Sequence, residues 1–291
     1  MGINMYSNGG AGGHWGNAGG SNGGYGIGGS AGNLARITLN NTTVSGSGFG
    51  IAVQSWGGYG QDSALAGGFG GERDAGSGGN GGVATVNLRG STTITVTGPG
   101  PGDVNAGVGL ISRGGNGGKG ELIGGFGGHV NAGSGGNANA VNFTSEAPSK
   151  IVTNGDDIYG VIARSIGGDA ATNNGSNSRA KAGGNAGAIT IDNAGTITTS
   201  GNRAIGIMAL SKGGQGGNGG DGTWGAGHRG APGGTPGAIN ITNSGIILTG
   251  RNDTVGAYGI LAQALGGQGG LGGDGGGFGS GGPGGGAPRS Q

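Results

Sequence analysis

The chain has 291 residues, of which 90 are glycine, and its 14 Lys and Arg nearly balance 13 Asp and Glu, for a net charge of +1. Sparse, balanced charge excludes a nucleic-acid-binding protein, which needs a basic stripe to neutralise phosphates. The absence of cysteine excludes a disulfide framework, a cysteine zinc cluster and a thiol nucleophile. No apolar run approaches the roughly 18 residues of a spanning helix, so no transmembrane segment is predicted in this chain.

One nine-residue motif, Gly-[Ile/Val]-x-x-x-[Ser/Ala]-x-Gly-Gly, recurs along the chain. Its six copies begin at Gly2, Gly50, Gly107, Gly160, Gly206 and Gly259. The copies are 48, 57, 53, 46 and 53 residues apart. A motif that returns at a period near fifty residues indicates an array of similar units. We therefore predict that residues 1–291 form a single repeat array with no separate globular domain.

Each unit has a Gly-rich excursion followed by a strand-like segment. The excursions span about residues 8–32, 57–82, 114–137, 167–187, 213–237 and 266–288. The strand-like segments span about residues 33–56, 83–113, 138–166, 188–212 and 238–265. The excursions are of similar length, which is typical of a structural element, because disordered insertions vary more.

Every strand-like segment contains three short pieces in which apolar residues alternate with polar or small ones. The first segment shows the pattern at Ile37 and Leu39, at Val44, and at Ile51 and Val53 within the motif. Alternation bounded by turn residues predicts strands with one buried face. Such short strands cannot bury their apolar side chains alone, and stacked copies complete a continuous core.

The expected fold is therefore all-β, a parallel β-solenoid of about six repeats of roughly 50 residues. One buried column is expected to contain Ile51, Val108, Val161, Ile207 and Ile260. A second column of small inward residues is expected at Ser55, Ser112, Ser165 and Ser211. The alternative is a set of antiparallel hairpins in separate modules, although the turns are not of the two-residue Asn-Gly type.

The excursions contain Gly-Gly-x triplets, most clearly from Gly213 to Asp221. A three-residue period matches the turn of a polyproline II helix and predicts that the excursions pack as polyproline II or polyglycine II helices. In that case a bulky residue at Gly217 should disrupt the packing, whereas one at Asn218, the outward x position, should be tolerated. The alternative is a flexible Gly-rich linker, because ordering glycine costs more backbone entropy than ordering any other residue.

Several patterns resemble chemical sites, and each has a simpler explanation. Residues 28–32 match G-x-S-x-G around Ser30, but the nucleophile elbow needs a strand–turn–helix context that is not readable here. His14, His129 and His228 lie in different excursions and are expected to be scattered surface residues rather than a metal site. The Gly-Asp pieces at 220–222 and 273–275 lack the tandem repeats of calcium-binding arrays. We predict no catalytic, cofactor-binding or metal-binding residue and no cofactor.

Threonines recur in the second strand piece and the turns before it. They are Thr42 and Thr43, then Thr93, Thr95 and Thr97, then Thr196, Thr198 and Thr199. Such ladders on a flat outer face would suit ice or a crystalline polysaccharide, although threonine is also simply a good exposed strand residue. Asp156 and Asp157 are expected to mark a solvated turn.

The motif phrases GIAVQSWGG, YGVIARSIGG, IGIMALSKGG and YGILAQALGG, with AITIDNAGTITTSG and AINITNSGIILTG between them, resemble the Gly-rich passenger regions of bacterial autotransporters. The resemblance covers nearly the whole chain, with residues 50–58, 160–168, 206–214 and 259–267 matching the repeat. It implies a β-helical, surface-exposed stalk that is anchored to the outer membrane through a barrel of the parent chain. The family's signal peptide and barrel are not recognisable in this sequence.

The resulting expectation is a structural and adhesive segment of a surface-exposed bacterial repeat protein that is not an enzyme. Its surface ligand is unknown, and a glycan, a host surface or a neighbouring cell are all compatible, as are neighbouring repeats of a longer chain. The alternative is an ice- or glycan-binding module with a flat Thr- or Gly-lined face. A third possibility, an enzyme such as a polysaccharide lyase, lacks any cluster of acids or bases in register.

Overall fold

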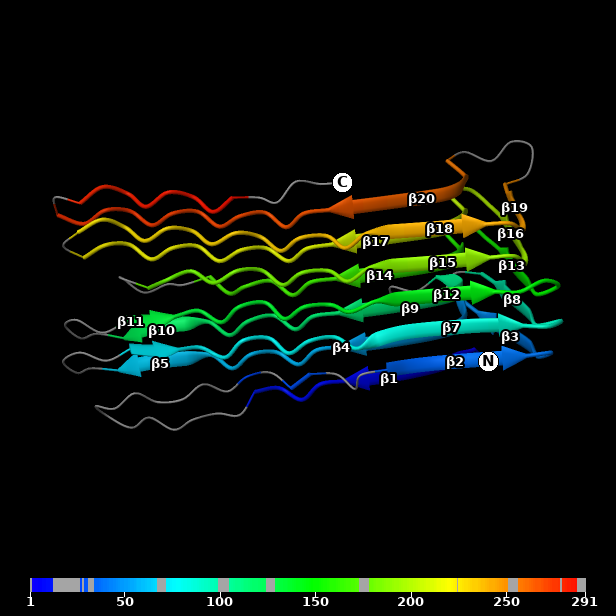
Figure 1. Ribbon diagram of the computed structural model, residues 1–291, viewed down its shortest axis with the longest axis horizontal. Coiled ribbons are helices and arrows are strands. Elements are labelled where there is room, and N and C mark those ends of the chain that lie inside the picture. Colours follow the sequence, from blue (N-terminus) through cyan, green and yellow to red (C-terminus); the bar gives the residue numbers. More distant parts are fainter. Residues whose placement is uncertain are drawn as a thin grey trace.

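The computed structural model describes residues 2–12, 27, 29–30, 34–66, 72–98, 105–123, 129–172, 178–223, 225–250, 256–277 and 279–286. These residues form strands, turns and extended segments, with no helix among them. Three larger sheets consist of parallel strands, an arrangement consistent with a parallel β-solenoid (Figure 1). The all-β prediction is thus confirmed, and the alternative of antiparallel hairpins is wrong, because every recorded strand pairing is parallel.

Sheet A is six-stranded and contains the copies of the motif. Its strands, in spatial order, are β1 (Ile3–Asn8), β4 (Phe49–Trp56), β9 (Ala106–Arg113), β14 (Tyr159–Ile166), β17 (Ile205–Lys212) and β20 (Tyr258–Leu265). Equivalent motif positions pair directly, since Ile51 faces Val108 and Val161 faces both Val108 and Ile207. The register therefore follows the sequence repeat.

Sheets B and C hold the other two strand pieces. Sheet B contains β2 (Leu34–Asn40), β7 (Val83–Arg89), β12 (Val141–Ser145), β15 (Ile189–Asn193) and β18 (Ile239–Asn243). Sheet C contains β3 (Thr43–Ser47), β8 (Thr93–Thr97), β13 (Lys150–Asn154), β16 (Thr196–Ser200) and β19 (Ile246–Thr249). In Figure 1, strands of sheets A and B run in opposite directions along the long axis, and sheet C lies at one end of both.

The core is a continuous column of aliphatic side chains contributed by all three sheets. Ile51, Val108, Val161 and Ile207 are each 0% exposed, as the alternation predicts. Ile260 was expected in the same buried column, but it is 44% exposed. It pairs with Ile207 in the correct register, yet β20 is the edge strand of sheet A, so no described strand covers its other side.

The first glycine of the motif lies where sheets A and C approach most closely. A Cβ on Gly50 would lie 2.3 Å from Cγ2 of Ile94, and a Cβ on Gly160 would lie 2.4 Å from Cγ2 of Ile197. No side chain fits at such a separation, because real Cβ contacts are much longer. The same position at Gly259 has no atom within 4 Å. Glycine is therefore required by packing inside the stack but not at Gly259, on the edge strand β20.

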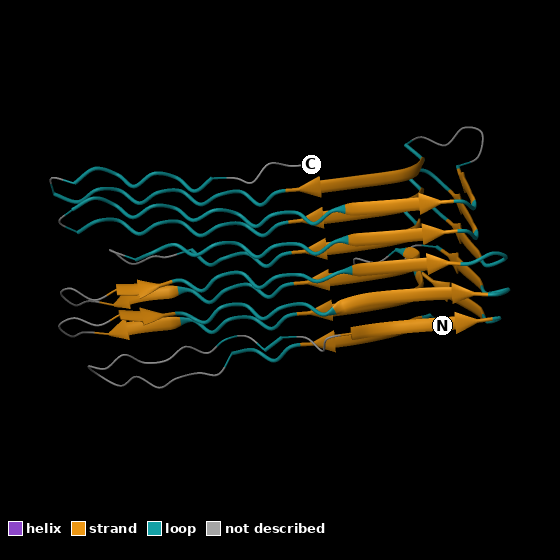
Figure 2. Ribbon diagram, viewed as in Figure 1, coloured by secondary structure: helices purple, strands orange, loops and turns teal. Residues whose placement is uncertain are grey.

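The Gly-rich excursions are long extended segments that leave sheet A and return to sheet B (Figure 2). We call the parts that follow sheet A outgoing legs and those that precede sheet B returning legs. The described outgoing legs span 9–12, 57–62, 114–119, 167–172, 213–222 and 266–277. The described returning legs span 75–82, 132–140, 178–188, 226–238 and 279–286.

Legs of the same kind bond to each other from one motif copy to the next. Gly60 N–H donates to the Asn116 carbonyl and Gly216 N–H donates to the Gln268 carbonyl, both at 2.8 Å. Among returning legs, Gly81 N–H donates to the Asn137 carbonyl at 2.9 Å. Each kind of leg therefore forms its own layer, as a continuation of sheet A or of sheet B.

A second set of backbone bonds zigzags between the two layers. Each glycine in this set donates its N–H to the carbonyl of the one before, at 2.6–2.9 Å. The series is Gly10, Gly29, Gly58, Gly79, Gly115, Gly136, Gly168, Gly184, Gly214, Gly234 and Gly267. A side chain has no room between the layers, because a Cβ on Gly167 of an outgoing leg would lie 1.9 Å from the Gly184 carbonyl oxygen of a returning leg. The glycines therefore allow the two layers to touch backbone to backbone.

The serine of the motif joins sheet A to the returning leg. Ser55, Ser112, Ser165 and Ser211 are all fully buried, as predicted. The Ser112 hydroxyl donates to the Gly82 carbonyl at 2.9 Å and accepts from Asn139 N–H at 2.8 Å. Ser55 and Ser211 accept in the same way from Gly82 and Gly237. These hydroxyls satisfy buried backbone groups that no ladder partner reaches.

Polar side chains at the x positions of the legs also have a structural role. Asn218 was expected to be a tolerant outward position, but its Oδ1 accepts the N–H of Leu271 at 2.9 Å. Asn116 accepts likewise from Asp169, and Asp169 from Gln215, at 3.0 and 2.7 Å. An outward side chain can therefore bond to the backbone of the neighbouring leg, and a substitution at Asn218 would remove this bond.

Two small sheets lie farther out on the legs. The pair of β5 (Ser63–Ala66) and β10 (Gly120–Ile123) and the pair of β6 (Glu72–Asp74) and β11 (His129–Asn131) are both parallel and in register. They show that two neighbouring excursions remain paired beyond their Gly-rich part.

Candidate functional site

Among the described residues, those that resembled chemical sites form no cluster. His14 lies outside the described residues, His129 lies in β11, and His228 lies on a returning leg where its N–H donates to the Gly220 carbonyl. In the part of the chain that the structure describes, no group of three or more His, Cys, Asp or Glu side chains is placed to hold a metal ion. Ser30 of the G-x-S-x-G match is exposed, and its Oγ accepts a 3.3 Å bond from Asn80 N–H.

The Gly-Asp pieces have the same structural role as the other x positions. Asp221 Oδ1 accepts the N–H of Asp274 at 2.8 Å, so the two residues stack on neighbouring outgoing legs. This hydrogen bond to the backbone is enough to explain an acidic side chain at this position, and no bound metal ion is needed to explain it.

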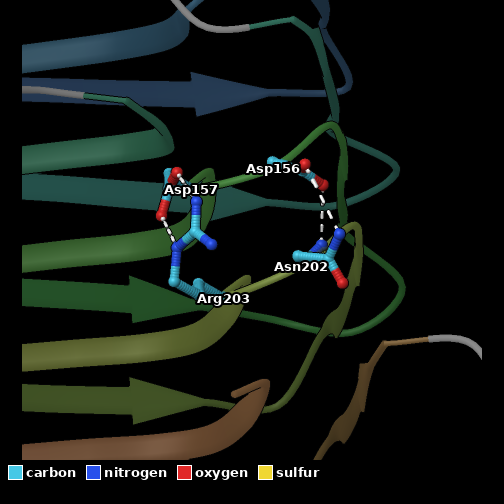
Figure 3. A network of polar contacts seen from close by, with 4 residues as sticks. All are labelled: Asp156, Asp157, Asn202 and Arg203. Atoms are coloured by element: carbon cyan, nitrogen blue, oxygen red, sulfur yellow. Dashed lines mark hydrogen bonds and ion pairs between the residues drawn. The ribbon is translucent and has the colours of Figure 1, made fainter. Parts of the chain in front are cut away.

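Asp156 and Asp157 lie in the turn between β13 and β14, as predicted, and they bond to the equivalent turn of the next motif copy (Figure 3). Asp156 Oδ1 accepts from Asn202 N–H at 2.7 Å. Arg203 donates to both carboxylate oxygens of Asp157, with the Nε–Oδ1 bond at 2.7 Å. This hydrogen bonding by Arg203, aided by its charge, lowers the pKa of Asp157, and Asp157 in turn raises the pKa of Arg203. The cluster links two turns.

The threonine ladder predicted on the second strand pieces is only partly present on the outer face of sheet C. Thr43 of β3 pairs with Thr93 of β8, but the partner of Thr93 on the next strand, β13, is Lys150. In the same way, Thr95 of β8 pairs with Val152 of β13. Thr199 was expected on this face, yet it is 1% exposed and points inward. Its neighbour Ile197 is also buried, and residues two apart share one face of a strand.

Sheet B presents a more regular polar surface. Its outward positions form two straight rows, because each strand pairs in register with the next. One row is Arg36, Thr85, Asn142, Thr190 and Asn240, and the other is Thr38, Asn87, Thr144, Asp192 and Thr242. We call these two rows the Thr–Asn face. From β7 onward, each strand carries one threonine and one Asn or Asp, and their order alternates from strand to strand.

Most of the Thr–Asn face is open to solvent. Thr38, Thr190 and Asp192 are exposed, Asn87 and Thr144 are half-buried, and Thr85 is 6% exposed. Asn87 Nδ2 lies 3.4 Å from the Thr38 hydroxyl, so neighbouring residues within one row contact each other between strands. The sequence contained a signal for this face, since these residues alternate with Ile37, Val86 and their equivalents. The positions of the threonines alone do not reveal it.

The returning legs extend this surface with a row of oriented amides. Oδ1 of Asn80 accepts from Asn137 N–H, and Oδ1 of Asn137 accepts from Asn185 N–H, both at 2.8 Å. Asn185 Oδ1 accepts from Thr235 N–H at 2.8 Å. Since the carbonyl end of each amide is held by the backbone, its Nδ2 donor points away from that bond. These three asparagines are exposed and lie just before β7, β12 and β15.

Comparison with known proteins gives little similarity. No family model and no curated protein matches this chain. Among solved structures, a springtail antifreeze protein from Granisotoma rainieri, described as a nine polyproline type II helical bundle, aligns at 22% identity over 63% of this chain and 95% of that chain. The TM-score is 0.16, which is far below that of a shared fold, so this similarity supports no inference.

A search for membrane-crossing helices was also negative. Across the described ranges, no helix has the length and apolar character needed to cross a membrane.

Proposed function

We propose that this chain is a structural and adhesive segment of a surface-exposed bacterial repeat protein, without catalytic activity of its own. The observation that carries the proposal is the glycine zigzag from Gly10 to Gly267, which ties both leg layers together across all strands of sheet A. Continuous backbone bonding of this kind is suited to a stiff element that projects a surface. A catalytic pocket would need converging reactive groups, and the described acids and histidines are dispersed.

We further propose that the legs pack as polyglycine II helices in a stack of about six repeats. The three-residue period of the Gly-Gly-x triplets supports this, as does the alternation of bonds within and between layers. Such helices have no internal hydrogen bonds, so every buried N–H must find a neighbouring leg. Lateral bonds, each worth a net stabilisation of about 0.5–1.5 kcal/mol, then offset the entropy cost of ordering glycine.

The proposed cellular setting is the passenger region of an autotransporter on the outer surface of a bacterium. It rests on the motif phrases, such as GIAVQSWGG and YGVIARSIGG, and on the parallel stacking of their strands. The absence of cysteine is compatible with export of an unfolded chain, because no cysteine pair has to be kept reduced during export. Reading the gene that surrounds this sequence would test the secretion class directly.

An adhesion assay tests the function itself. The chain would be displayed on a non-adherent bacterial strain, and retention under flow would be measured on glycan-coated surfaces, on host-cell layers and on lawns of the same strain. The control is a flexible Gly/Ser chain of equal length on the same carrier. We expect stronger retention than the control on at least one surface. Retention equal to the control on every surface would overturn the adhesive function.

A further inference from the structure

We infer that the Thr–Asn face of sheet B is the adhesive surface and that its ligand is an extended, neutral, polyhydroxylated polymer, a glycan. This inference rests on the proposed adhesive function, which it makes specific. Five residues at the centre of the face carry the argument: Asn142 and Thr190 in one row, and Asn87, Thr144 and Asp192 in the other. Thr85, in the same row as Asn142, is buried and is not counted.

The first step is the charge of the face. Its two rows contain one base and one acid, Arg36 and Asp192, on strands that are not neighbours. A polyanion would meet no basic stripe here, which excludes nucleic acid and acidic polymers. All residues of the two rows are polar or charged, and the exposed apolar residue Leu34 lies on the edge strand β2, outside the rows. A lipid surface or an apolar protein patch therefore gains little from the two rows. The charge of the face is therefore complementary to a ligand without net charge.

The second step is hydrogen-bonding capacity. Each threonine hydroxyl both donates and accepts, and each asparagine amide donates twice and accepts twice. Hydroxyl groups of a sugar need the same mixture of donors and acceptors. Beside the face, the amides of Asn80, Asn137 and Asn185 are already held in position by backbone bonds. Ordered donors lose less conformational entropy when a ligand binds.

The third step is geometry. Paired strands repeat at about 4.7–4.9 Å, and residues two apart on a strand repeat at about 6.6–6.8 Å, so the face is a regular grid. Such a grid suits a ligand that repeats along a line or over a surface. Threonine and asparagine differ in length, so the alternation places polar atoms at two heights. A corrugated polymer surface fits this relief better than a plane of ice does.

The test is retention of the full chain on suspensions of crystalline cellulose, chitin and insoluble amylose. A double variant, Thr144→Lys with Thr190→Lys, changes the face. A matched variant, Thr95→Lys with Thr198→Lys, changes outward threonines of β8 and β16 on sheet C. We expect the sheet B variant to lower affinity for at least one glycan by roughly tenfold or more, and the sheet C variant to leave it nearly unchanged. Thermal unfolding of both variants confirms that they remain folded.

Several outcomes would overturn the inference. Equal loss in both variants, or loss only in the sheet C variant, would place the contact elsewhere. Ice shaping that the sheet B variant abolishes, without glycan retention, would show that the ligand class is wrong. If displaying cells adhere under flow but both variants adhere as well as the parent chain, the face is wrong and the adhesive function survives. If the parent chain neither adheres nor binds any glycan, the adhesive function itself fails.

Discussion

Gly107 of sheet A lies against Ile151 of sheet C so closely that a Cβ on Gly107 would be 2.3 Å from Cγ2 of Ile151. The same relation recurs between Gly50 and Ile94, and between Gly206 and Ile247. It explains why the motif begins with glycine, and it couples the two sheets at the inner levels of the stack, from Gly50 to Gly206.

Replacing Gly107 with alanine should therefore destabilise the protein. The new methyl group must displace Ile151 or the strand that carries it, at a cost typical of overpacking, about 1–3 kcal/mol. The matched control is Gly259→Ala, at the same motif position on the edge strand, where no atom lies within 4 Å. Urea unfolding should separate the two variants, and equal midpoints would contradict the packing described here.

Removing the Ser112 hydroxyl should also be costly. Ser112→Ala leaves the Asn139 N–H and the Gly82 carbonyl without the bonds of 2.8 and 2.9 Å that they now make. The loss of a buried partner costs about 1–3 kcal/mol. Ser47→Ala, at an exposed position of β3, is the control and should stay within about 0.5 kcal/mol. Comparable unfolding free energies for both variants would argue against the serine linkage.

Two buried threonines predict stabilising substitutions. Oγ1 of Thr153 and Oγ1 of Thr199 are buried, and neither has a hydrogen-bond partner among the described residues. Thr153 pairs in register with Val96, so this column already accepts valine. Thr153→Val should raise the free energy of unfolding by about 1–3 kcal/mol, because it removes an unsatisfied hydroxyl at nearly constant shape. Thr95→Val, on the outer face of β8, should change little, and a destabilised Thr153→Val would show that the hydroxyl is bonded after all.

The pair of Asp157 and Arg203 predicts a response to acid. Its hydrogen bond lowers the folded pKa of Asp157 below the unfolded value of about 3.9, so the stabilisation is fully present above that pH. It is lost as the pH falls through the folded pKa. A carbon-detected titration should find the pKa of Asp157 depressed, and Arg203→Gln should return it towards 3.9. An unchanged pKa in Arg203→Gln would assign the shift to another group.

Much of the stack could be predicted from the sequence. The alternation of apolar and polar residues predicts which side chains are buried, and the repeat period predicts which residues pair. Val108 and Val161 are apolar at the same motif position, so parallel register and burial follow directly. The same rule places Thr199 inside, two residues after Ile197, although its residue type suggested the surface. The exposure of Ile260 depends on its position at the edge of the stack, which no local pattern records.

The contacts between distant segments were less predictable. Nothing near Gly50 in the sequence reveals that Ile94 of another strand will occupy the space of its side chain. The role of Asn218 depends on the neighbouring leg, whose Leu271 N–H is 53 residues away. The outward residues of the Thr–Asn face could be recognised by their alternation with Ile37 and Val86, whereas their alignment into two rows follows from the register of five strands.

The central claim is that the glycine legs form an ordered, hydrogen-bonded double layer, and amide hydrogen exchange of the leg glycines tests it most directly. Gly115, Gly136 and Gly168 each donate a backbone bond to the opposite layer at 2.8–2.9 Å. If the layers are packed, these amides should exchange at least about a hundredfold more slowly than in an unstructured peptide, because exchange requires the stack to open. Exchange of all three at the rate of an unstructured peptide would mean that the legs are flexible linkers and that the double layer does not exist.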